Sequence, residues 1–194
     1  MTGVALVSGS HARQRRRPQA SDPSRATGRG HAYAVVMTTS LRIGLISDTH
    51  GLLRPEARDA LNGSDLIVHA GDVGKLDVLT GLCELAPVVA VRGNVDTDDW
   101  AAVLAEAETL TVAGVGMHVR HVREELGLPD PGWRLVVTGH SHRPAIARDG
   151  AVLHVNPGSA GPRRFSLPVT VAVVEVVGGE VSARVVELAV DVRR

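Results

Sequence analysis

The stretch Leu41-Arg-Ile-Gly-Leu-Ile-Ser-Asp-Thr-His50 decides the fold of this chain. Its apolar residues, among them Ile43 and Leu45, form a short run that ends in turn residues, which is typical of a buried strand in a parallel sheet. Asp48 and His50 close the run. Side chains two residues apart on an extended strand point to the same side, so this carboxylate and this imidazole can bind one ion. A single Asp-x-His pair is weak evidence for a metal site, and the later segments have to support it.

Four later segments repeat the same design of an apolar run followed by a metal-binding residue type. Strands are predicted within residues 65–72, 88–94 and 134–140, and a hairpin is predicted over 109–121. Short helices are predicted at 55–61 and 76–85, between the first three strands. Strands that alternate with helices at this spacing form βαβ units around a parallel sheet, so the fold class is α/β. The pattern further predicts a helix over 98–107, a strand over 151–155 and a closing hairpin of 169–177 with 181–188.

The N-terminal segment differs from the rest of the chain. Residues 1–37 lack hydrophobic periodicity, and residues 1–40 hold six Arg and one Asp. We interpret 1–37 as a disordered tail or an over-extended start that precedes Met37, with a nucleic-acid or membrane arm as the alternative. Residues 38–194 are predicted to form one domain.

Composition narrows the function classes. The chain has 194 residues, 44% of them hydrophobic, and no apolar stretch of the roughly 20 residues that a membrane helix needs. Its single cysteine, Cys83, excludes an intrachain disulfide and suits a reducing cytoplasm. The chain after residue 40 is mildly acidic and has few aromatic residues, so we expect no membrane association and no nucleic-acid-binding surface. A nucleic acid is expected to bind only through an end that serves as substrate.

The polar residues at the predicted strand ends form one candidate site. They are Asp48, His50, Asp72, Asn94, His121, His140 and His142. Open α/β sheets bind ligands at the carboxyl ends of their strands, so these side chains are expected to converge. Mixed imidazole and carboxylate donors suit Mn, Ni, Fe, Zn or Co. Seven donors exceed the needs of one tetrahedral ion but suit two divalent ions about 3.5–4 Å apart that share a carboxylate.

These motifs, in this order over residues 41–177, resemble those of the calcineurin-like metallophosphoesterases. The short chain and the late Asn156-Pro-Gly-Ser159 are similar to the small bacterial and archaeal phosphodiesterase branch. The resemblance implies a two-sheet β-sandwich flanked by helices, the four-layer fold of that superfamily. It also implies a two-metal phosphoesterase in which a metal-bridging hydroxide attacks the phosphorus of a small phosphodiester.

The resemblance also implies a division of the ligands. Asp48, His50 and His142 would bind one metal ion, and Asn94, His121 and His140 would bind the other, with Asp72 bridging the two. His118 is the alternative to His121. We favour His121 because it continues the side-chain alternation of Val115, Met117 and Val119 at the end of the hairpin, although Val122 stands where the family usually has Gly.

One departure concerns catalysis. Many members of the superfamily have a histidine after the Asn that aligns with Asn94, where this chain has Val95, so a general acid is missing. The small phosphodiesterase branch commonly lacks it too. The alternative function is a catalytically inactive protein-binding scaffold of the same fold, like the retromer scaffold subunit of eukaryotes.

Four further residues are weaker candidates. They are His69, as a core or supporting histidine, and His154, Arg163 and Arg164, as possible phosphate contacts.

Overall fold

The computed structural model describes residues 40–164 and 166–190. The prediction for residues 1–37 therefore falls outside the described part of the chain. Two α-helices and ten strands make up most of the fold, with two short 3-10 helices in the connections. No helix in the described ranges is long and apolar enough to cross a membrane.

The first half of the chain alternates strands and helices as predicted. Its elements are β1 (Ser40–Ile46), α1 (Pro55–Leu61), β2 (Leu66–His69), α2 (Leu76–Cys83) and β3 (Val88–Ala90). Pro55 occupies the first turn of α1, where its missing N–H costs no hydrogen bond. The second half is mostly strands. Its elements are η1 (Asp99–Val103), β4 (Ala107–Val112), β5 (Val115–Arg120), η2 (Arg123–Glu125), β6 (Trp133–Val137), β7 (Ala145–Asp149), β8 (Val152–Asn156), β9 (Thr170–Val177) and β10 (Glu180–Glu187).

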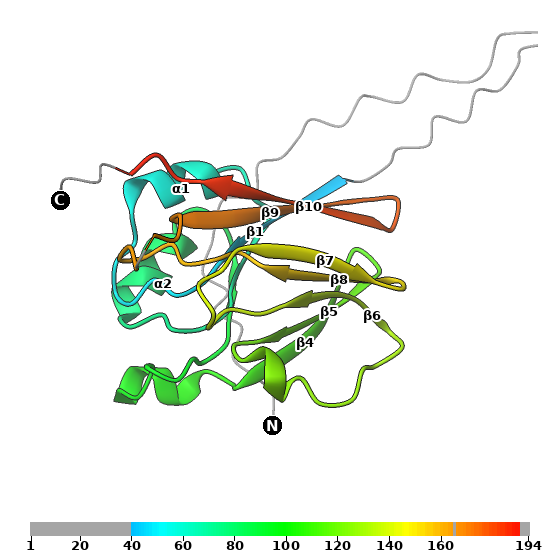
Figure 1. Ribbon diagram of the computed structural model, residues 1–194, viewed down its shortest axis with the longest axis horizontal. Coiled ribbons are helices and arrows are strands. Elements are labelled where there is room, and N and C mark those ends of the chain that lie inside the picture. Colours follow the sequence, from blue (N-terminus) through cyan, green and yellow to red (C-terminus); the bar gives the residue numbers. More distant parts are fainter. Residues whose placement is uncertain (1–39, 165, 191–194) are drawn as a thin grey trace, which may run out of the picture.

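The strands form two sheets of five strands each. The first, sheet A, has the order β10-β9-β1-β2-β3, and the second, sheet B, has the order β4-β5-β6-β8-β7. The pairs β1–β2, β2–β3, β5–β6 and β6–β8 are parallel, and the pairs β1–β9, β9–β10, β4–β5 and β7–β8 are antiparallel. Figure 1 shows the two sheets stacked face to face, with α1 and α2 beside sheet A. The predicted α/β class and two-sheet sandwich are confirmed.

Alternation along β1 explains the layers. Ile43 and Leu45 face sheet B and belong to the core between the sheets, together with Met117 of β5 and Leu135 of β6. Ile46 has the opposite parity and belongs to a second core, in which it packs with Leu61 of α1. Sheet A is therefore buried on both faces, as expected for strands that have helices on one side and a second sheet on the other.

Two predictions about secondary structure need correction. Residues 98–107 do not form an α-helix, because Asp99–Val103 is a 3-10 helix and β4 already begins at Ala107. The chain must turn from sheet A to sheet B here, and the backbone bonds from Ala101 and Leu104 to residues three positions earlier make a tighter turn than an α-helix. Strand β7 was not predicted, since all five of its residues are exposed and give no apolar alternation.

Candidate metal centre

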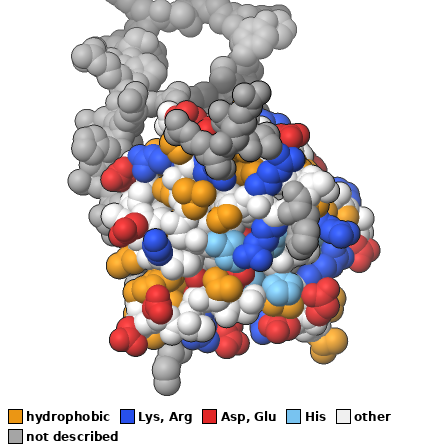
Figure 2. All heavy atoms as spheres, turned by 60° about the vertical axis from the view of Figure 1, so that its left-hand side comes forward, with side chains coloured by type: hydrophobic (Ala, Val, Ile, Leu, Met, Phe, Trp, Pro, Cys, Tyr) orange, Lys and Arg blue, Asp and Glu red, His pale blue; other side chains and the backbone are white. Residues whose placement is uncertain are grey.

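All seven predicted ligands follow the carboxyl ends of strands. Asp48 and His50 come after β1, and Asp72 and Asn94 after β2 and β3, so these four belong to sheet A. The ligands from sheet B are the histidines that follow β5 and β6, which are His121, His140 and His142. Parallel strands place these ends at one edge of each sheet, and the two edges meet (Figure 1). Figure 2 shows this side of the molecule, with histidine side chains exposed near its centre.

The backbone at these positions is unusual. Six non-glycine residues in the described ranges have a positive φ, and five of them are predicted ligands, namely Asp48, His50, Asp72, His140 and His142. The sixth is Ala113, in the hairpin between β4 and β5. Left-handed backbone at such residues typically costs of order 1–3 kcal/mol each and is found where function requires it. The side chains of Asp48 and His50 do lie together, but the reason given from the sequence, an extended strand, is wrong. Both residues lie in a strained loop after β1.

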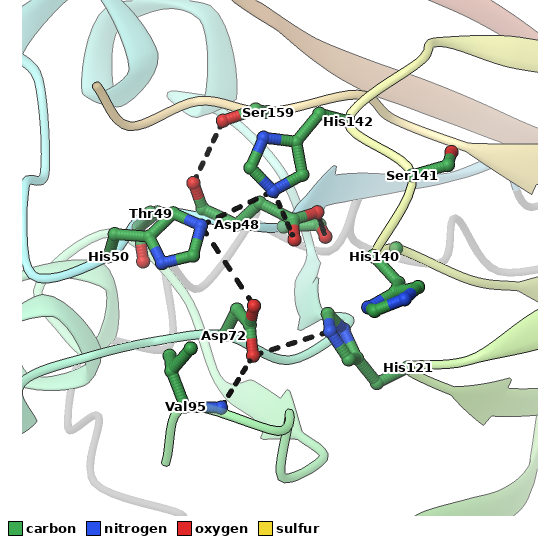
Figure 3. Close-up of polar contacts among 12 residues, drawn as sticks. Asp48, Thr49, His50, Asp72, Val95, His121, His140, Ser141, His142 and Ser159 are labelled. Atoms are coloured by element: carbon green, nitrogen blue, oxygen red, sulfur yellow. Dashed lines mark hydrogen bonds and ion pairs between the residues drawn. The ribbon is translucent and has the colours of Figure 1, made fainter. Parts of the chain in front are cut away.

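A first group of donor atoms forms between the two sheets (Figure 3). One side-chain atom each from Asp48, His50, Asp72 and His142 lies within 4.8 Å of all the others. His142 Nε2 is 3.2 Å from Asp48 Oδ1 and 3.3 Å from His50 Nε2. Ligand atoms about 2.1 Å from a shared transition-metal ion are themselves about 3.0–3.4 Å apart, so these spacings suit one ion.

The polar atoms of this first group are poorly satisfied without a cation. Asp48 Oδ1, which faces the other donors, is buried and has no hydrogen-bond partner among the described residues. Burial raises the pKa of Asp48 to about 7, despite a hydrogen bond from Ser47. Burial, with the charge of His50, lowers the pKa of His142 to about 4. A carboxylate and two neutral imidazoles that point at one another are the donor set for a divalent first-row metal, so the residues fit such an ion.

A second group of donors adjoins the first through Asp72. Asn94 Oδ1 lies 3.1 Å from both His121 Nε2 and His140 Nδ1, and His121 Nε2 lies 3.3 Å from Asp72 Oδ1. The other oxygen of Asp72, Oδ2, faces His50 Nε2 at 3.9 Å. Asp72 thus presents one carboxylate oxygen to each group, which is the position predicted for a bridging ligand.

Electrostatics at Asp72 favour positive charge. Burial alone would raise its pKa, but the hydrogen bonds from His121 and from the N–H of Val95 outweigh burial and lower the pKa to about 2. Burial would lower the pKa of His121, but contacts with Asp72 and the carbonyl of Ala70 raise it instead. The charge of Asp72 therefore favours a positive charge beside it, which a bound metal ion would supply.

His121, and not His118, faces the centre. Its Nδ1 donates to the Ala70 carbonyl at 2.7 Å, which leaves Nε2 directed at Asn94 and Asp72. Such a second hydrogen bond orients metal-binding histidines. His118 lies mid-strand on β5, where its ring stacks on Trp133 with centroids 4.1 Å apart and its Nδ1 contacts Thr109 Oγ1. The structure thus keeps His118 away from the site, as predicted.

Asp96 is a supporting residue that the sequence did not single out. It is buried, and its carboxylate accepts from the backbone N–H groups of Val73, Gly74 and Gly93 at 2.8–3.1 Å. These bonds tie the loop after β2 to the loop after β3. Gly93 is needed there because a Cβ at this position would collide with the backbone N and Oδ1 of Asp72. No local sequence signal marks Asp96, because Val73 and Gly74 are 23 and 22 residues away from it along the chain.

The segment 156–161 supports the loop after β1. Ser159 Oγ donates to the Asp48 carbonyl at 2.9 Å, and the Ala160 N–H donates to the Ser47 carbonyl. Asn156 Nδ2 donates to the carbonyl of Gly139, just before His140. Asn156-Pro-Gly-Ser159 is thus a turn that supports the loops bearing the donors.

The weaker candidates lie in different places. His69 is fully buried and contacts Thr49 Oγ1 at 3.0 Å, so it supports the loop between Asp48 and His50. Arg164 is exposed, but its charge is among the causes that lower the pKa of His50 and His142. The His154 side chain, on β8, is outside both donor groups and lines a cavity beside His140.

Comparison with known sequences identifies the family. The profile of the calcineurin-like phosphoesterase superfamily domain matches residues 41–179. The chain belongs to this superfamily. A probable metallophosphoesterase of Methanothermobacter thermautotrophicus is 34% identical in an alignment of 170 positions that covers 78% of this chain and 95% of the relative. The family resemblance inferred from the motifs is confirmed, and the name of this relative supports a hydrolase.

Solved structures share the fold at lower identity. An archaeal phosphodiesterase aligns with a TM-score of 0.62 and 20% identity, over 75% of this chain and 100% of its own. Vps29 of Entamoeba histolytica, solved in complex with zinc, aligns with a TM-score of 0.55 and 20% identity, over 76% of this chain and 99% of its own. At these identities the likeness establishes the fold alone.

Proposed function

We propose that this protein hydrolyses small phosphodiesters with two divalent first-row metal ions. The observation that carries the proposal is the pair of donor groups joined by Asp72, whose two carboxylate oxygens face different groups. The relative named as a probable metallophosphoesterase and the archaeal phosphodiesterase of the same fold support it.

The contacts support a division of the ligands between two ions. Asp48, His50 and His142 would hold one ion, and Asn94, His121 and His140 the other. Asp72 would hold both. When bound, the two ions would stabilise the charge of the phosphoryl oxygens and lower the pKa of a coordinated water toward about 7.

The residues of the chain supply orientation and charge. The Ala70 carbonyl fixes the ring of His121, and the N–H of Val95 holds one oxygen of Asp72. Asp48 and Asp72 are buried in strained loops that Ser159 and Asp96 brace, so little reorganisation is needed on binding. Arg164 adds positive charge beside His50 and His142, which favours a phosphate.

The leaving group receives little help from this chain. Position 95, where many relatives have an imidazole, holds the 42% exposed side chain of Val95. The neighbouring Asp96 uses its carboxylate on backbone N–H groups and offers no proton. We therefore expect good leaving groups, such as aryloxides, to be released much faster than alkoxides.

A turnover assay tests the proposal. Protein reconstituted with Mn²⁺ should hydrolyse bis(p-nitrophenyl) phosphate, and a chelator should abolish the activity. Asp72→Asn should lower kcat by at least ~100-fold, because loss of a supporting group alone typically costs 10–100-fold. The matched control is Asp59→Asn on the exposed side of α1, which should leave kcat unchanged. Wild-type protein that carries metal and turns over no phosphodiester would refute the proposal.

The second candidate is a protein-binding scaffold without catalysis. The observation in its favour is the alignment with Vps29, which reaches similar TM-scores to the phosphodiesterase. All seven donor positions are filled in this chain, which favours the enzyme. The same turnover assay separates the two candidates, since a scaffold predicts metal binding with no hydrolysis.

A further inference from the structure

A small cavity lies beside the second donor group, on the outer face of sheet B. Its volume is about 190 Å³, and His140 and His154 form part of its wall. His154 alternates with Leu153 and Val155, which are buried between the sheets, so its ring points outward from β8. Two small residues of β7, Ala145 and Ala147, pair with Asn156 and His154 and leave the space open.

Two arginines give this cavity a positive charge. Arg123 of η2 and Arg143, just after His142, both line it, and Glu124 is the only acid among the lining residues. Neither guanidinium makes an ion pair with any described carboxylate, in contrast to Arg58, Arg92 and Arg120. Figure 2 shows basic side chains grouped next to histidines on this side of the molecule.

The cavity on the other side of the donor groups has the opposite character. It has a volume of about 610 Å³, and its wall includes Asn94 and His121. Its two arginines, Arg92 and Arg120, are already paired with Glu106 and Glu125 at 2.9 and 2.8 Å. The exposed Asp98 and Asp99 add further negative charge. An anionic group would be repelled on this side, so the two cavities make the surroundings of the donor groups electrically asymmetric.

We propose that the cavity of Arg123, Arg143 and His154 binds a second phosphate of the substrate, so that the preferred substrates are phosphodiesters that carry another phosphate near the scissile one. Guanidinium forks form paired hydrogen bonds with phosphate oxygens, and a neutral His154 can donate one more. His140 lines the cavity and contacts Asn94 of the second donor group, so the two phosphates would lie on adjacent surfaces. The inference rests on the proposed function, because it assigns the first phosphate to the metal ions.

Equilibrium binding tests this subsite without relying on turnover. Thymidine 3′,5′-bisphosphate and thymidine 5′-monophosphate differ by one phosphate, and their affinities for Mn²⁺-loaded protein can be measured by calorimetry. Wild type should bind the bisphosphate about 10-fold more tightly, as expected for charge-assisted bonds at a partly exposed site. Arg123→Gln and Arg143→Gln should each bring the ratio of the two dissociation constants toward one.

The control is Arg184→Gln, which removes an exposed arginine of β10 that belongs to sheet A and does not line the cavity, and it should leave the ratio unchanged. Equal affinity of wild type for the two nucleotides would overturn the subsite. So would a ratio of dissociation constants that none of the three substitutions changes, or one that all three reduce to the same extent. If the ratio behaves as expected but the loaded protein hydrolyses no phosphodiester, the proposed function fails and the subsite stands.

Discussion

Substitution of Asp96 by Asn tests whether the loops that carry the donors are held together from behind. The carboxylate accepts three backbone N–H groups, two of them at 2.8 Å, and is 3% exposed. An Asn of the same shape keeps one acceptor oxygen but turns an NH₂ group toward a backbone N–H, so at least one bond is lost and two donors face each other. A hydrogen bond to a charged group contributes about 1.5–3 kcal/mol, so the expected destabilisation is about 2–4 kcal/mol.

Two measurements follow for Asp96→Asn. In a domain of this size 1 kcal/mol shifts Tm by about 2–4 °C, so the melting temperature of the metal-free protein should fall by roughly 5–12 °C. The affinity for Mn²⁺ should fall about 10–100-fold, because the loops bearing Asp72 and Asn94 lose their common anchor. Asp98→Asn is the matched control, an exposed acid two residues further along. If both variants melt and bind metal alike, Asp96 does not brace the site.

Three other predictions concern the donors and the leaving group. His121→Ala should lower metal occupancy and collapse turnover, whereas His118→Ala should mainly cost stability through its lost stacking on Trp133; activity data in the reverse order would exclude His121 as a ligand. Burial raises the pKa of Asp48 to about 7, so below pH 7 a metal ion must displace its proton. Mn²⁺ affinity measured by calorimetry should therefore fall as the pH is lowered from 8 to 6, and an affinity that stays constant over this range would contradict the assignment of Asp48 as a ligand. Val95→His should improve the hydrolysis of alkyl esters by less than ~100-fold, because the Asp96 carboxylate already accepts three backbone hydrogen bonds and cannot orient the new ring. A larger gain in a leaving-group series would contradict this prediction.

The sequence predicted the parts of the fold that depend on the alternation of apolar residues along a strand and of strands with helices along the chain. Ile43 and Leu45 pointed to a strand with one face in the core, and the spacing of strands and helices pointed to parallel pairing, both of which are confirmed. Strand β7 gave no signal because an exposed edge strand has no apolar face. The turn at Asp99–Val103 was mistaken for a helix because the apolar Ala101 and Leu104, three residues apart, suit a 3-10 turn as well as an α-helix.

The site was predictable as a set of residues but not as a geometry. The seven donors could be selected because each follows an apolar run, and the structure brings them together. The left-handed backbone at Asp48 and His50 could not be foreseen, since non-glycine residues rarely adopt it without tertiary support. The roles of Asp96 and of the cavity at Arg123 depend on contacts between loops that are distant in sequence, which no local pattern encodes.

The number of metal ions per chain tests the central claim most directly. The claim is that Asp72 joins two donor groups into one centre, each group able to hold an ion. Wild-type protein that is stripped with a chelator, reconstituted with excess Mn²⁺ and freed of loosely bound metal should contain two ions per chain by elemental analysis, and Asp72→Asn should lose metal from both positions. One ion per chain in fully reconstituted wild type would contradict the two-metal centre.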